Sequence, residues 1–209
     1  MRAMASVEEH LFDREHQMIH LLTPPFMQDV QSPGYIKGYV AGIRENGGQY
    51  THAAVWSAIG AFSCGKDALG AEMLFAITPA LRARDPRLEK AYRIEPYVFA
   101  GDVYANPSHI ARGGWSWYTG SAAWYRRAVL EWLCGYREDG EGFTLAPHLS
   151  QGFSSFSLEI SKRDTHYTID VSLGKYTHAT LDGCEILSTA HFLFDGGKHH
   201  VRLEYAENT

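Results

Sequence analysis

The spacing of the apolar residues changes near Tyr136, and this change divides the chain into a helical region followed by a region of strands. Before Tyr136, apolar side chains recur every three or four positions, as on one face of a helix. This spacing predicts helices over about 50–64, 66–78 and 120–135, and a short helix from Ser6 to Arg14. Gly65 and Gly135 stand where a left-handed residue commonly ends a helix.

After Tyr136, short runs with alternating apolar residues predict β-strands. The runs are Phe156–Ile160, Thr165–Val171, Thr180–Leu181, His191–Phe194 and His200–Tyr205. Turn signals separate them at Asp182-Gly183 and Asp195-Gly196-Gly197. We therefore predict a mainly α chain with a β tail, in which residues 1–136 form the helical domain and residues 137–209 form a small antiparallel β domain.

Composition limits the possible partners. The chain has 209 residues, of which 45% are hydrophobic, enough to bury the core of one large domain or two small ones. A formal net charge of −5 provides no general attraction to nucleic acid or to an anionic membrane, so we expect neither and expect any anion site to be local. No run approaches the roughly 20 apolar residues of a membrane span.

The cysteines and histidines bear on redox environment and metal binding. Cys64, Cys134 and Cys184 are odd in number and lack a C-x-x-C spacing, which argues against a disulfide framework or a zinc site and favours the cytoplasm. The 11 histidines are scattered along the chain. Metal sites need convergent ligands, so we expect no metal and no resident cofactor.

Two polar loops, each rich in glycine and aromatic residues, lead into predicted helices. The first is Arg44–His52, with the sequence RENGGQYTH, and the second is Arg112–Gly120, with the sequence RGGWSWYTG. A phosphate group is bound by N–H groups at a helix N-terminus, a hydroxyl and a nearby imidazole or cation. Thr119, Gly120 and His52 supply these groups. The alternative interpretation is that Thr119 is only a helix cap and His52 only a buried imidazole.

The same loops contain groups suited to a sugar, which is bound by aromatic faces together with charged or amide side chains. These groups are Tyr39, Arg44, Glu45, Asn46 and Gln49, with Trp115, Trp117 and Tyr118. Aromatic residues at such positions are also common in cores. Glu45 is the main carboxylate candidate, and Glu95 and Asp102 are the other carboxylates in candidate loops. The alternative interpretation of Glu95 and Asp102 is loop capping and salt bridges.

Five motifs together resemble a known family. They are Pro33–Tyr39, Gly42–Ala54, Tyr92–Val98, Asp102–Tyr104 and Arg112–Ser121. In this order they resemble the inverting glycoside phosphorylases of the cellobiose and chitobiose phosphorylase type, and still more the phosphorylase-like region of the cyclic β-1,2-glucan synthases. The resemblance extends over nearly the whole chain.

The resemblance implies a fold, a reaction and site residues. The fold would be the C-terminal part of an (α/α)6 barrel followed by a small antiparallel β domain. Inorganic phosphate would be the co-substrate, cleaving or transferring β-linked glucosyl units with inversion to give α-glucose 1-phosphate. By motif, His52, Thr119 and Gly120 would bind phosphate, and Tyr39, Arg44 and Glu45 would bind the sugar substrate.

The family's general acid, an aspartate, lies far upstream of the Glu-Asn-Gly-Gly motif, so we expect it outside this chain and assign no catalytic residue. The chain would then be a truncated reading frame, a split subunit or a remnant. Its expected partners are a β-linked glucose oligosaccharide, phosphate, and either an N-terminal barrel fragment or further copies of itself. A cytoplasmic location would include the cytoplasmic part of an inner-membrane synthase.

The sequence also allows two other functions. It leaves open whether this chain alone is an enzyme. The chain could be a non-catalytic carbohydrate-binding or interaction fragment that uses the same aromatic loops. It could also be an inverting hydrolase in which Glu45 activates water, although His52 together with Thr119 and Gly120 suits phosphate better.

Overall fold

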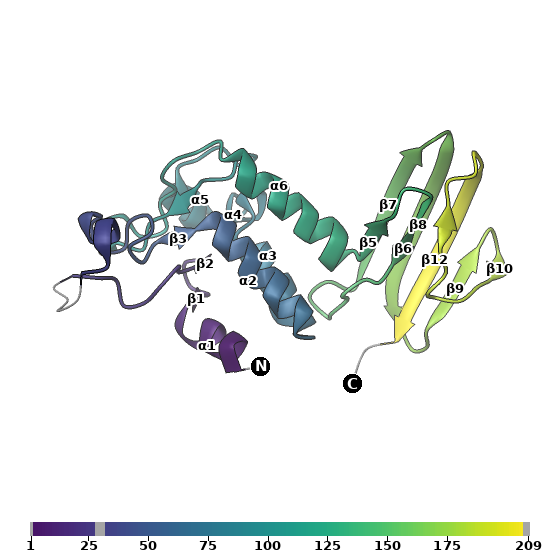
Figure 1. Cartoon of the computed structure of the whole chain (residues 1–209), viewed down its shortest axis with the longest axis horizontal. Helices are drawn as coiled ribbons and strands as arrows, with labels where there is room; N and C mark the ends of the chain where they lie inside the picture. Colours follow the sequence, from purple (N-terminus) through teal and green to yellow (C-terminus); the bar gives the residue numbers. More distant parts are fainter. Residues whose placement is uncertain (1, 28–31, 207–209) are drawn as a thin grey trace. The chain divides into compact units, whose positions relative to one another are not determined.

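The computed structural model describes residues 2–27 and 32–206 (Figure 1). Its internal contacts divide the chain into two compact units, Met1–Ala128 and Val129–Thr209, and each unit is described separately. This division falls eight residues before the domain boundary predicted from the periodicity. The predicted domain bounds stay a prediction.

Helices dominate the first unit. They are α1 (Arg2–His10), α2 (Thr51–Ser63), α3 (Asp67–Ala76), α4 (Pro79–Arg82), α5 (Pro86–Tyr92) and α6 (Thr119–Arg127). A π-helical turn, η3 (Ala128–Leu133), follows α6. The three long helices predicted by the apolar spacing are confirmed, whereas the first helix begins and ends earlier than predicted. Gly65 has φ +70° and donates its N–H to the Phe62 carbonyl, which ends α2 as expected.

Close packing of α2 against α3 gives the first unit a rigid support. A side chain at Gly70 of α3 would meet the ring of Phe62 at 2.8 Å, so the two helices approach because Gly70 has none. Ala58, Ala61 and Phe62 of α2 are fully or almost fully buried. Because α2 is held along its length, its first turn is also held in place.

Short strands position the loops of the first unit. β1 (Phe12–Asp13) pairs with β2 (Met18–Ile19), and β3 (Gln49–Tyr50) pairs with β4 (Asp102–Val103), both antiparallel. Two 3₁₀ helices, η1 (Gly34–Gly38) and η2 (Pro107–His109), complete the unit. In the β3–β4 register Tyr50 lies opposite Asp102, whose carbonyl accepts a hydrogen bond from the Gly114 N–H. β4 therefore lies between the segment before α2 and the segment before α6.

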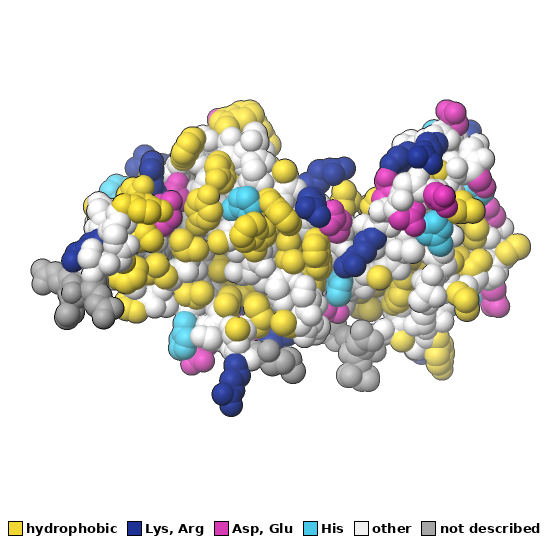
Figure 2. Space-filling model, in the orientation of Figure 1, with side chains coloured by type: hydrophobic (Ala, Val, Ile, Leu, Met, Phe, Trp, Pro, Cys, Tyr) yellow, Lys and Arg dark blue, Asp and Glu magenta, His cyan; other side chains and the backbone are white. Residues whose placement is uncertain are grey.

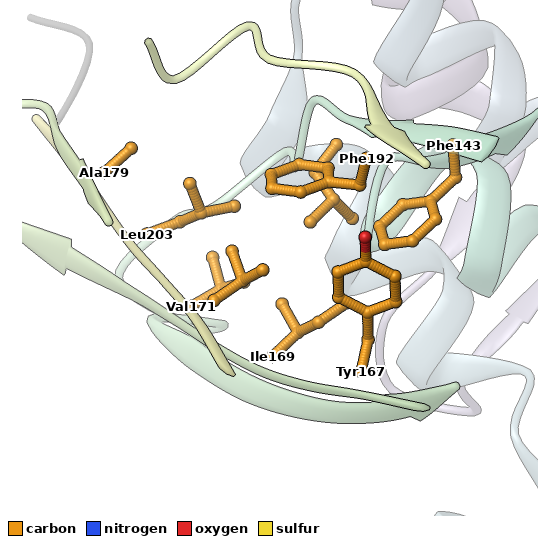
Figure 3. Packing of buried hydrophobic residues seen from close by; sticks show 9 residues of the cluster. Phe143, Tyr167, Ile169, Val171, Ala179, Phe192 and Leu203 are labelled. Carbon is orange, nitrogen blue, oxygen red and sulfur yellow. The ribbon is translucent and has the colours of Figure 1, made fainter. Parts of the chain in front are cut away.

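The second unit consists of two sheets. The larger has the strand order β10-β9-β12-β8-β7 and the smaller the order β11-β6-β5. Their bounds are β5 (Tyr136–Glu138), β6 (Gly142–Leu145), β7 (Ser155–Lys162), β8 (Thr165–Gly174), β9 (His178–Leu181), β10 (Cys184–Glu185), β11 (Phe192–Leu193) and β12 (Lys198–Ala206). Side chains from both sheets form one core, in which Phe143 and Phe192 stack over Tyr167, Ile169 and Leu203 (Figure 3).

The predicted fold class, mainly α with a β tail, is wrong. The structure is 33% helical with 27% strand, and includes a five-stranded sheet. The description as part of an (α/α)6 barrel followed by an antiparallel domain falls with it. The larger sheet is mixed, because β12 runs parallel to β8 from Lys198↔His166 to Ala206↔Gly174. The prediction missed the parallel pair because alternation of apolar residues reveals a strand but not the direction of its neighbour. It overestimated the helical content because much of the region 80–119 forms loops and short helices.

Candidate functional site

The two loops identified in the sequence meet in the first unit. Beside the β3–β4 pairing, the hydroxyl groups of Tyr50 and Tyr118 form a hydrogen bond of 2.7 Å. Each tyrosine immediately precedes a helix, α2 and α6 respectively. This contact therefore holds the beginnings of both helices together.

A cavity of about 120 Å³ opens where the loops meet. Its lining residues are Arg44, Glu45, Tyr50, Gly101, Asp102, Trp115 and Tyr118. A cation, two carboxyl groups and three aromatic rings therefore surround a small space. Of the residues predicted to bind sugar, Arg44 and Glu45 line this cavity, as do Trp115 and Tyr118.

Asp102 lines this cavity, although the family resemblance assigned it no binding role. It is 5% exposed, and its Oδ1 accepts a 3.1 Å hydrogen bond from the Trp115 N–H. Its Oδ2 is buried and has no partner in the described structure. Burial raises the pKa of this carboxyl group above 3.8. Asp102 does anchor a loop, as predicted, and Gly114 is required there because a side chain would collide with Oδ1.

Arg44 and Tyr39 form one edge of the site. The Arg44 guanidinium lies 5.6 Å from the centre of the Tyr39 ring, and a hydrogen bond to Tyr39 raises the pKa of Arg44. Arg44 has φ +47°, a left-handed conformation that is unfavourable for a residue other than glycine. The Glu45 atom Oε2 is buried, with no partner among the described residues. Tyr39, Arg44 and Glu45 are therefore neighbours in space, as the motif suggested.

Asn46 and Gln49 support the fold and do not face the cavity. Asn46 is completely buried, and its amide bonds to the backbone of Phe26 and Tyr39. Gln49 accepts a hydrogen bond from the Ile19 N–H and donates one to Thr51. We therefore correct the prediction that the Asn46 and Gln49 side chains contact a sugar.

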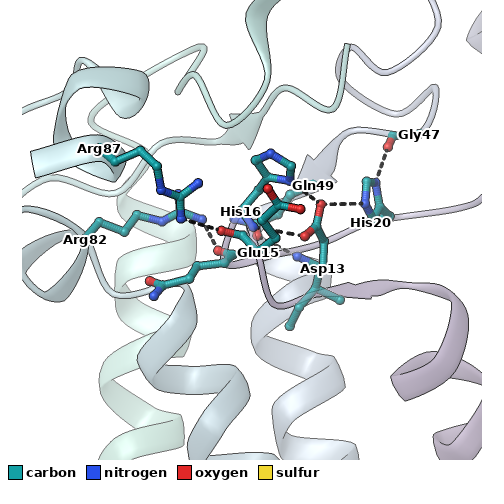
Figure 4. Close-up of polar contacts among 10 residues, drawn as sticks. Asp13, Glu15, His16, His20, Gly47, Gln49, Arg82 and Arg87 are labelled. Carbon is teal, nitrogen blue, oxygen red and sulfur yellow. Dashed lines mark hydrogen bonds and ion pairs between the residues drawn. The ribbon is translucent and has the colours of Figure 1, made fainter. Parts of the chain in front are cut away.

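Further polar contacts fix the Gly47 loop from its other side. His20 Nδ1 lies 3.0 Å from the Gly47 carbonyl oxygen, and Asp13 pairs with His16 at 2.8 Å (Figure 4). On the neighbouring turn, Arg82 and Arg87 donate hydrogen bonds to backbone carbonyl groups. The His20 contact holds the Gly47 loop, and the others hold the turn between β1 and β2. None of these residues lines the cavity.

The predicted phosphate-binding residues lie at the beginnings of α2 and α6. His52 is in the first turn of α2, and Thr119 and Gly120 are the first residues of α6. The residue preceding each helix makes no side-chain cap. In α2 the Thr51 N–H already donates to the Gly101 carbonyl, so only the other first-turn N–H groups are left for another acceptor. Thr119 and Gly120 are exposed. Apart from its chain neighbours and the backbone of its own helix, no described residue has an atom within 4 Å of the position that a side chain on Gly120 would occupy.

Aromatic rings surround His52. The centre of its imidazole ring lies 4.7 Å from that of Trp56 and 5.9 Å from that of Trp124. On the face of the first unit drawn in Figure 2, hydrophobic side chains gather over α2 and α6. The His52 ring is therefore restricted by its neighbours, while its Nε2 atom remains buried and unpartnered in the described structure.

Unpartnered polar atoms are concentrated at this site. Across residues 2–27 and 32–206, five buried side-chain nitrogen or oxygen atoms have no hydrogen-bond partner. They belong to Glu45, His52, Arg82, Asp102 and Ser121. Glu45 and Asp102 line the cavity, His52 begins α2, and Ser121 is the third residue of α6. Buried polar atoms without partners are costly, and their concentration is typical of a ligand site.

Comparison with known proteins identifies the family. Residues 1–135 match the model of the catalytic domain of the glycosyl hydrolase 94 superfamily, and the chain belongs to this family. The resemblance noted in the sequence is thereby confirmed.

Similar proteins include a glucan synthase and several phosphorylases. The chain is 42% identical over 173 residues to the cyclic β-(1,2)-glucan synthase NdvB of Rhizobium meliloti, a match covering 82% of this chain and 6% of that protein. It is 26% identical over 191 residues to the solabiose phosphorylase of Paenibacillus borealis, covering 88% and 24% respectively. For the N,N'-diacetylchitobiose phosphorylase of Vibrio proteolyticus, the identity is 23% over 172 residues, covering 81% and 21%.

The matched region is a small part of each of these relatives, between 6% and 24% of their length. Among the residues that the structure describes, no helix has the length and apolar character needed to cross a membrane.

Proposed function

We propose that this chain provides the sugar- and phosphate-binding site of a β-glucoside phosphorylase or cyclic β-1,2-glucan synthase. In the proposed reaction, a phosphate oxygen bonds to the anomeric carbon of a β-linked glucosyl unit while the glycosidic C–O bond breaks. The configuration inverts, α-glucose 1-phosphate forms, and the leaving oxygen takes a proton from a general acid. No residue described above is assigned as that acid.

The beginnings of α2 and α6 form the phosphate subsite in this proposal. His52 Nε2 donates to a phosphate oxygen, and Thr119 and Gly120 donate from the hydroxyl group and the first-turn N–H groups. The absence of a cap on either helix and the open space at Gly120 support this assignment. Two helix N-termini also favour an anion electrostatically.

The cavity and its Arg44 edge form the sugar subsite. The Glu45 and Asp102 carboxyl groups bond to hydroxyl groups of the sugar, and Arg44 donates to its oxygens. Tyr39 holds Arg44 through their hydrogen bond and ring contact. Support comes from the solabiose and N,N'-diacetylchitobiose phosphorylases, whose names specify disaccharides.

One observation carries the proposal: buried polar atoms of four residues in or next to the two loops and their cavity lack partners in the described structure. These residues are Glu45, His52, Asp102 and Ser121. A ligand with both hydroxyl groups and anionic oxygens would complement them. A purely apolar partner would leave them unpaired, at a cost of about 1–3 kcal/mol each.

The test is calorimetric titration of the chain with inorganic phosphate and with a β-1,2-linked glucose disaccharide. The unaltered chain should bind both. His52→Ala and Thr119→Ala should each weaken phosphate binding by roughly 10-fold, since a hydrogen bond to a charged group contributes about 1.5–3 kcal/mol. Glu45→Gln should weaken sugar binding and leave phosphate binding unchanged.

His10→Ala is the matched control for His52→Ala, because His10 is an exposed histidine in α1 of the same unit. It should leave both affinities unchanged. Equal phosphate affinities in the unaltered chain and both site variants would refute the assignment of His52 and Thr119.

Turnover would distinguish phosphorolysis from its alternatives. Release of glucose 1-phosphate from the disaccharide in phosphate buffer supports the proposal, whereas release of free glucose without phosphate dependence favours a hydrolase. Because no general acid is assigned in this chain, binding of both ligands without turnover agrees with the proposal and with a carbohydrate-binding role alike.

A further inference from the structure

Three exposed aromatic side chains lie beside the cavity of the first unit. Trp115 is 66% exposed, Trp117 is 63% exposed and Tyr97 is 74% exposed. Trp115 also lines the cavity. The ring centres of Tyr97 and Trp117 are 6.2 Å apart, with the rings nearly perpendicular. Trp115 and Trp117 are two positions apart in one loop, so their Cα atoms lie within about 7 Å of each other.

The backbone holds these residues firmly in the exposed position. Trp115 accepts a hydrogen bond from the Gly101 N–H and donates its own N–H to Asp102. The Tyr118 N–H donates to the Phe99 carbonyl at 3.0 Å. Trp117, between these anchors, has φ +57°, a left-handed conformation that costs roughly 1 kcal/mol or more for a residue with a side chain. The loop therefore presents a large indole ring to solvent in a fixed and unfavourable conformation.

Exposed rings in a fixed position suit a sugar chain. The faces of tryptophan and tyrosine offer large, rigid apolar areas, and an aromatic residue loses little conformational entropy on binding. The adjoining cavity is about 120 Å³, well below the roughly 300–1,000 Å³ of sites that enclose a drug-sized ligand. A ligand longer than one or two sugar units must therefore continue outside the cavity. Trp115 lines the cavity, is itself mostly exposed and lies two positions from Trp117.

We propose that Trp115, Trp117 and Tyr97 form a stacking platform that binds additional glucose units of a β-linked glucan chain whose end occupies the cavity. This inference rests on the proposed function, because it takes the cavity as the sugar subsite. It makes the preferred ligand an oligosaccharide longer than a disaccharide. Each ring contributes contact with the apolar face of a sugar unit, and the carboxyl groups of the cavity contribute hydrogen bonds.

The experiment is calorimetric titration of the full chain with β-1,2-linked glucose oligosaccharides of increasing length, from the disaccharide to the hexasaccharide. Affinity should rise with length and then become constant. Trp117→Ala should reduce affinity for the longest oligosaccharide by roughly 3- to 10-fold, the range expected for one aromatic contact. The same variant should change disaccharide and phosphate affinity by less than about twofold. Tyr97→Leu should show the same pattern with a smaller loss.

Tyr176→Ala is the matched control, because Tyr176 is 79% exposed but belongs to the second unit. It should leave all affinities unchanged. Retained phosphate binding in Trp117→Ala verifies that this variant is folded.

The platform is overturned if affinity does not depend on oligosaccharide length, or if Trp117→Ala leaves it unchanged. In either case, binding of the disaccharide and of phosphate by the unaltered chain still supports the proposed function. Failure of the unaltered chain to bind phosphate and every oligosaccharide overturns both. A loss of similar size for the disaccharide and the hexasaccharide would instead place Trp117 within the cavity subsite, and also overturns the platform.

Discussion

The two units differ in whether their buried polar side chains have hydrogen-bond partners. In the second unit, the Tyr167 hydroxyl donates to the Leu193 carbonyl at 2.7 Å, and Thr165 accepts from the Gly196 N–H at 2.7 Å. Within residues 129–206, every buried side-chain nitrogen or oxygen has a partner, whereas the first unit leaves atoms of Glu45, Asp102 and His52 without one. Paired polar groups stabilise a fold, and unpaired ones reduce its stability unless a ligand binds them. The comparison is what the proposed function expects, with paired polar groups in the second unit and unpaired ones at the loops of the first.

The aromatic residues follow the same division. In the second unit, the ring centre of Phe143 lies 5.0 Å from that of Tyr167 and 5.1 Å from that of Phe192, all within the core. In the first unit, Trp115 and Trp117 are mostly exposed. Buried rings stabilise the fold because their apolar area is removed from water, whereas exposed rings can have that area removed from water by a bound ligand.

The largest expected effect is that of Phe143→Ala in the β core. Phe143 is completely buried, so its truncation should lower the free energy of unfolding by about 3–5 kcal/mol. Chemical denaturation followed by circular dichroism measures this loss. Leu193→Ala is the control, because Leu193 is 52% exposed, and its effect should stay within about 0.5 kcal/mol. Similar losses in both variants would contradict the placement of the core.

Asp102→Asn should separate binding from stability. The amide preserves the acceptor for the Trp115 N–H and removes a buried charge, but its NH2 group takes the place of the unpartnered Oδ2. Because these two effects oppose each other, the free energy of unfolding at neutral pH should change by no more than about 1 kcal/mol. Sugar affinity should nevertheless fall by roughly tenfold, since a charged acceptor is lost. Denaturation and titration of the same preparation measure both, and a stable variant with unchanged sugar affinity would remove Asp102 from the site.

The pH dependence of that stability has a definite sign. Because the Asp102 pKa is raised in the folded protein, folding favours the protonated carboxyl group. The stability that the protonated Asp102 carboxyl group contributes is therefore fully present below pH 3.8, and it is lost as the pH rises from there through the folded-state pKa. Asp102→Asn should abolish this loss. An identical pH profile in both proteins would show that the carboxyl group is not buried as described.

The hydrogen bond between Tyr50 and Tyr118 is expected to contribute about 1 kcal/mol. It raises the pKa of Tyr50 to about 12. Tyr118→Phe should bring that pKa back towards 10 and lower stability by about the stated amount. Ultraviolet titration of the tyrosines measures the pKa. Tyr104→Phe, a substitution in a neighbouring loop, is the control, and a Tyr50 pKa unaffected by Tyr118→Phe would disprove the contact between the two loops.

The smallest expected effect concerns His199 in the second unit. Its Nδ1 lies 2.8 Å from Asp182 and its Nε2 3.0 Å from Asp195, and these carboxylates raise its pKa above 6.5. The stabilisation is complete below pH 6.5 and is lost as the pH rises through the folded-state pKa. It should amount to less than about 1 kcal/mol because the carboxylates are solvated. Thermal unfolding of His199→Gln between pH 5 and 9 should show a weaker pH dependence than that of the unaltered chain, and an equal dependence would exclude His199 as its source.

The sequence by itself determined the local elements and the family. Helical spacing identified α2, α3 and α6, because the spacing of apolar residues along one helix face is local information. The loop motifs showed a resemblance to the cellobiose and chitobiose phosphorylases, because consecutive residues can be compared directly, and the match of residues 1–135 to the glycosyl hydrolase 94 superfamily confirms it. The roles of His52, Thr119, Gly120, Tyr39, Arg44 and Glu45 stay predictions.

Only the tertiary structure decided which polar residues are structural and which face the cavity. Asn46 and Gln49 resemble site residues in sequence, but Phe26 and Ile19, distant in the chain, occupy their hydrogen-bonding groups. Asp102 resembles a loop cap, but the pairing of β3 with β4 brings it to the cavity beside Glu45. The parallel pairing of β12 with β8 was also invisible in the apolar pattern. Burial, strand direction and hydrogen-bond partners depend on contacts between residues far apart in the chain, and local periodicity does not contain them.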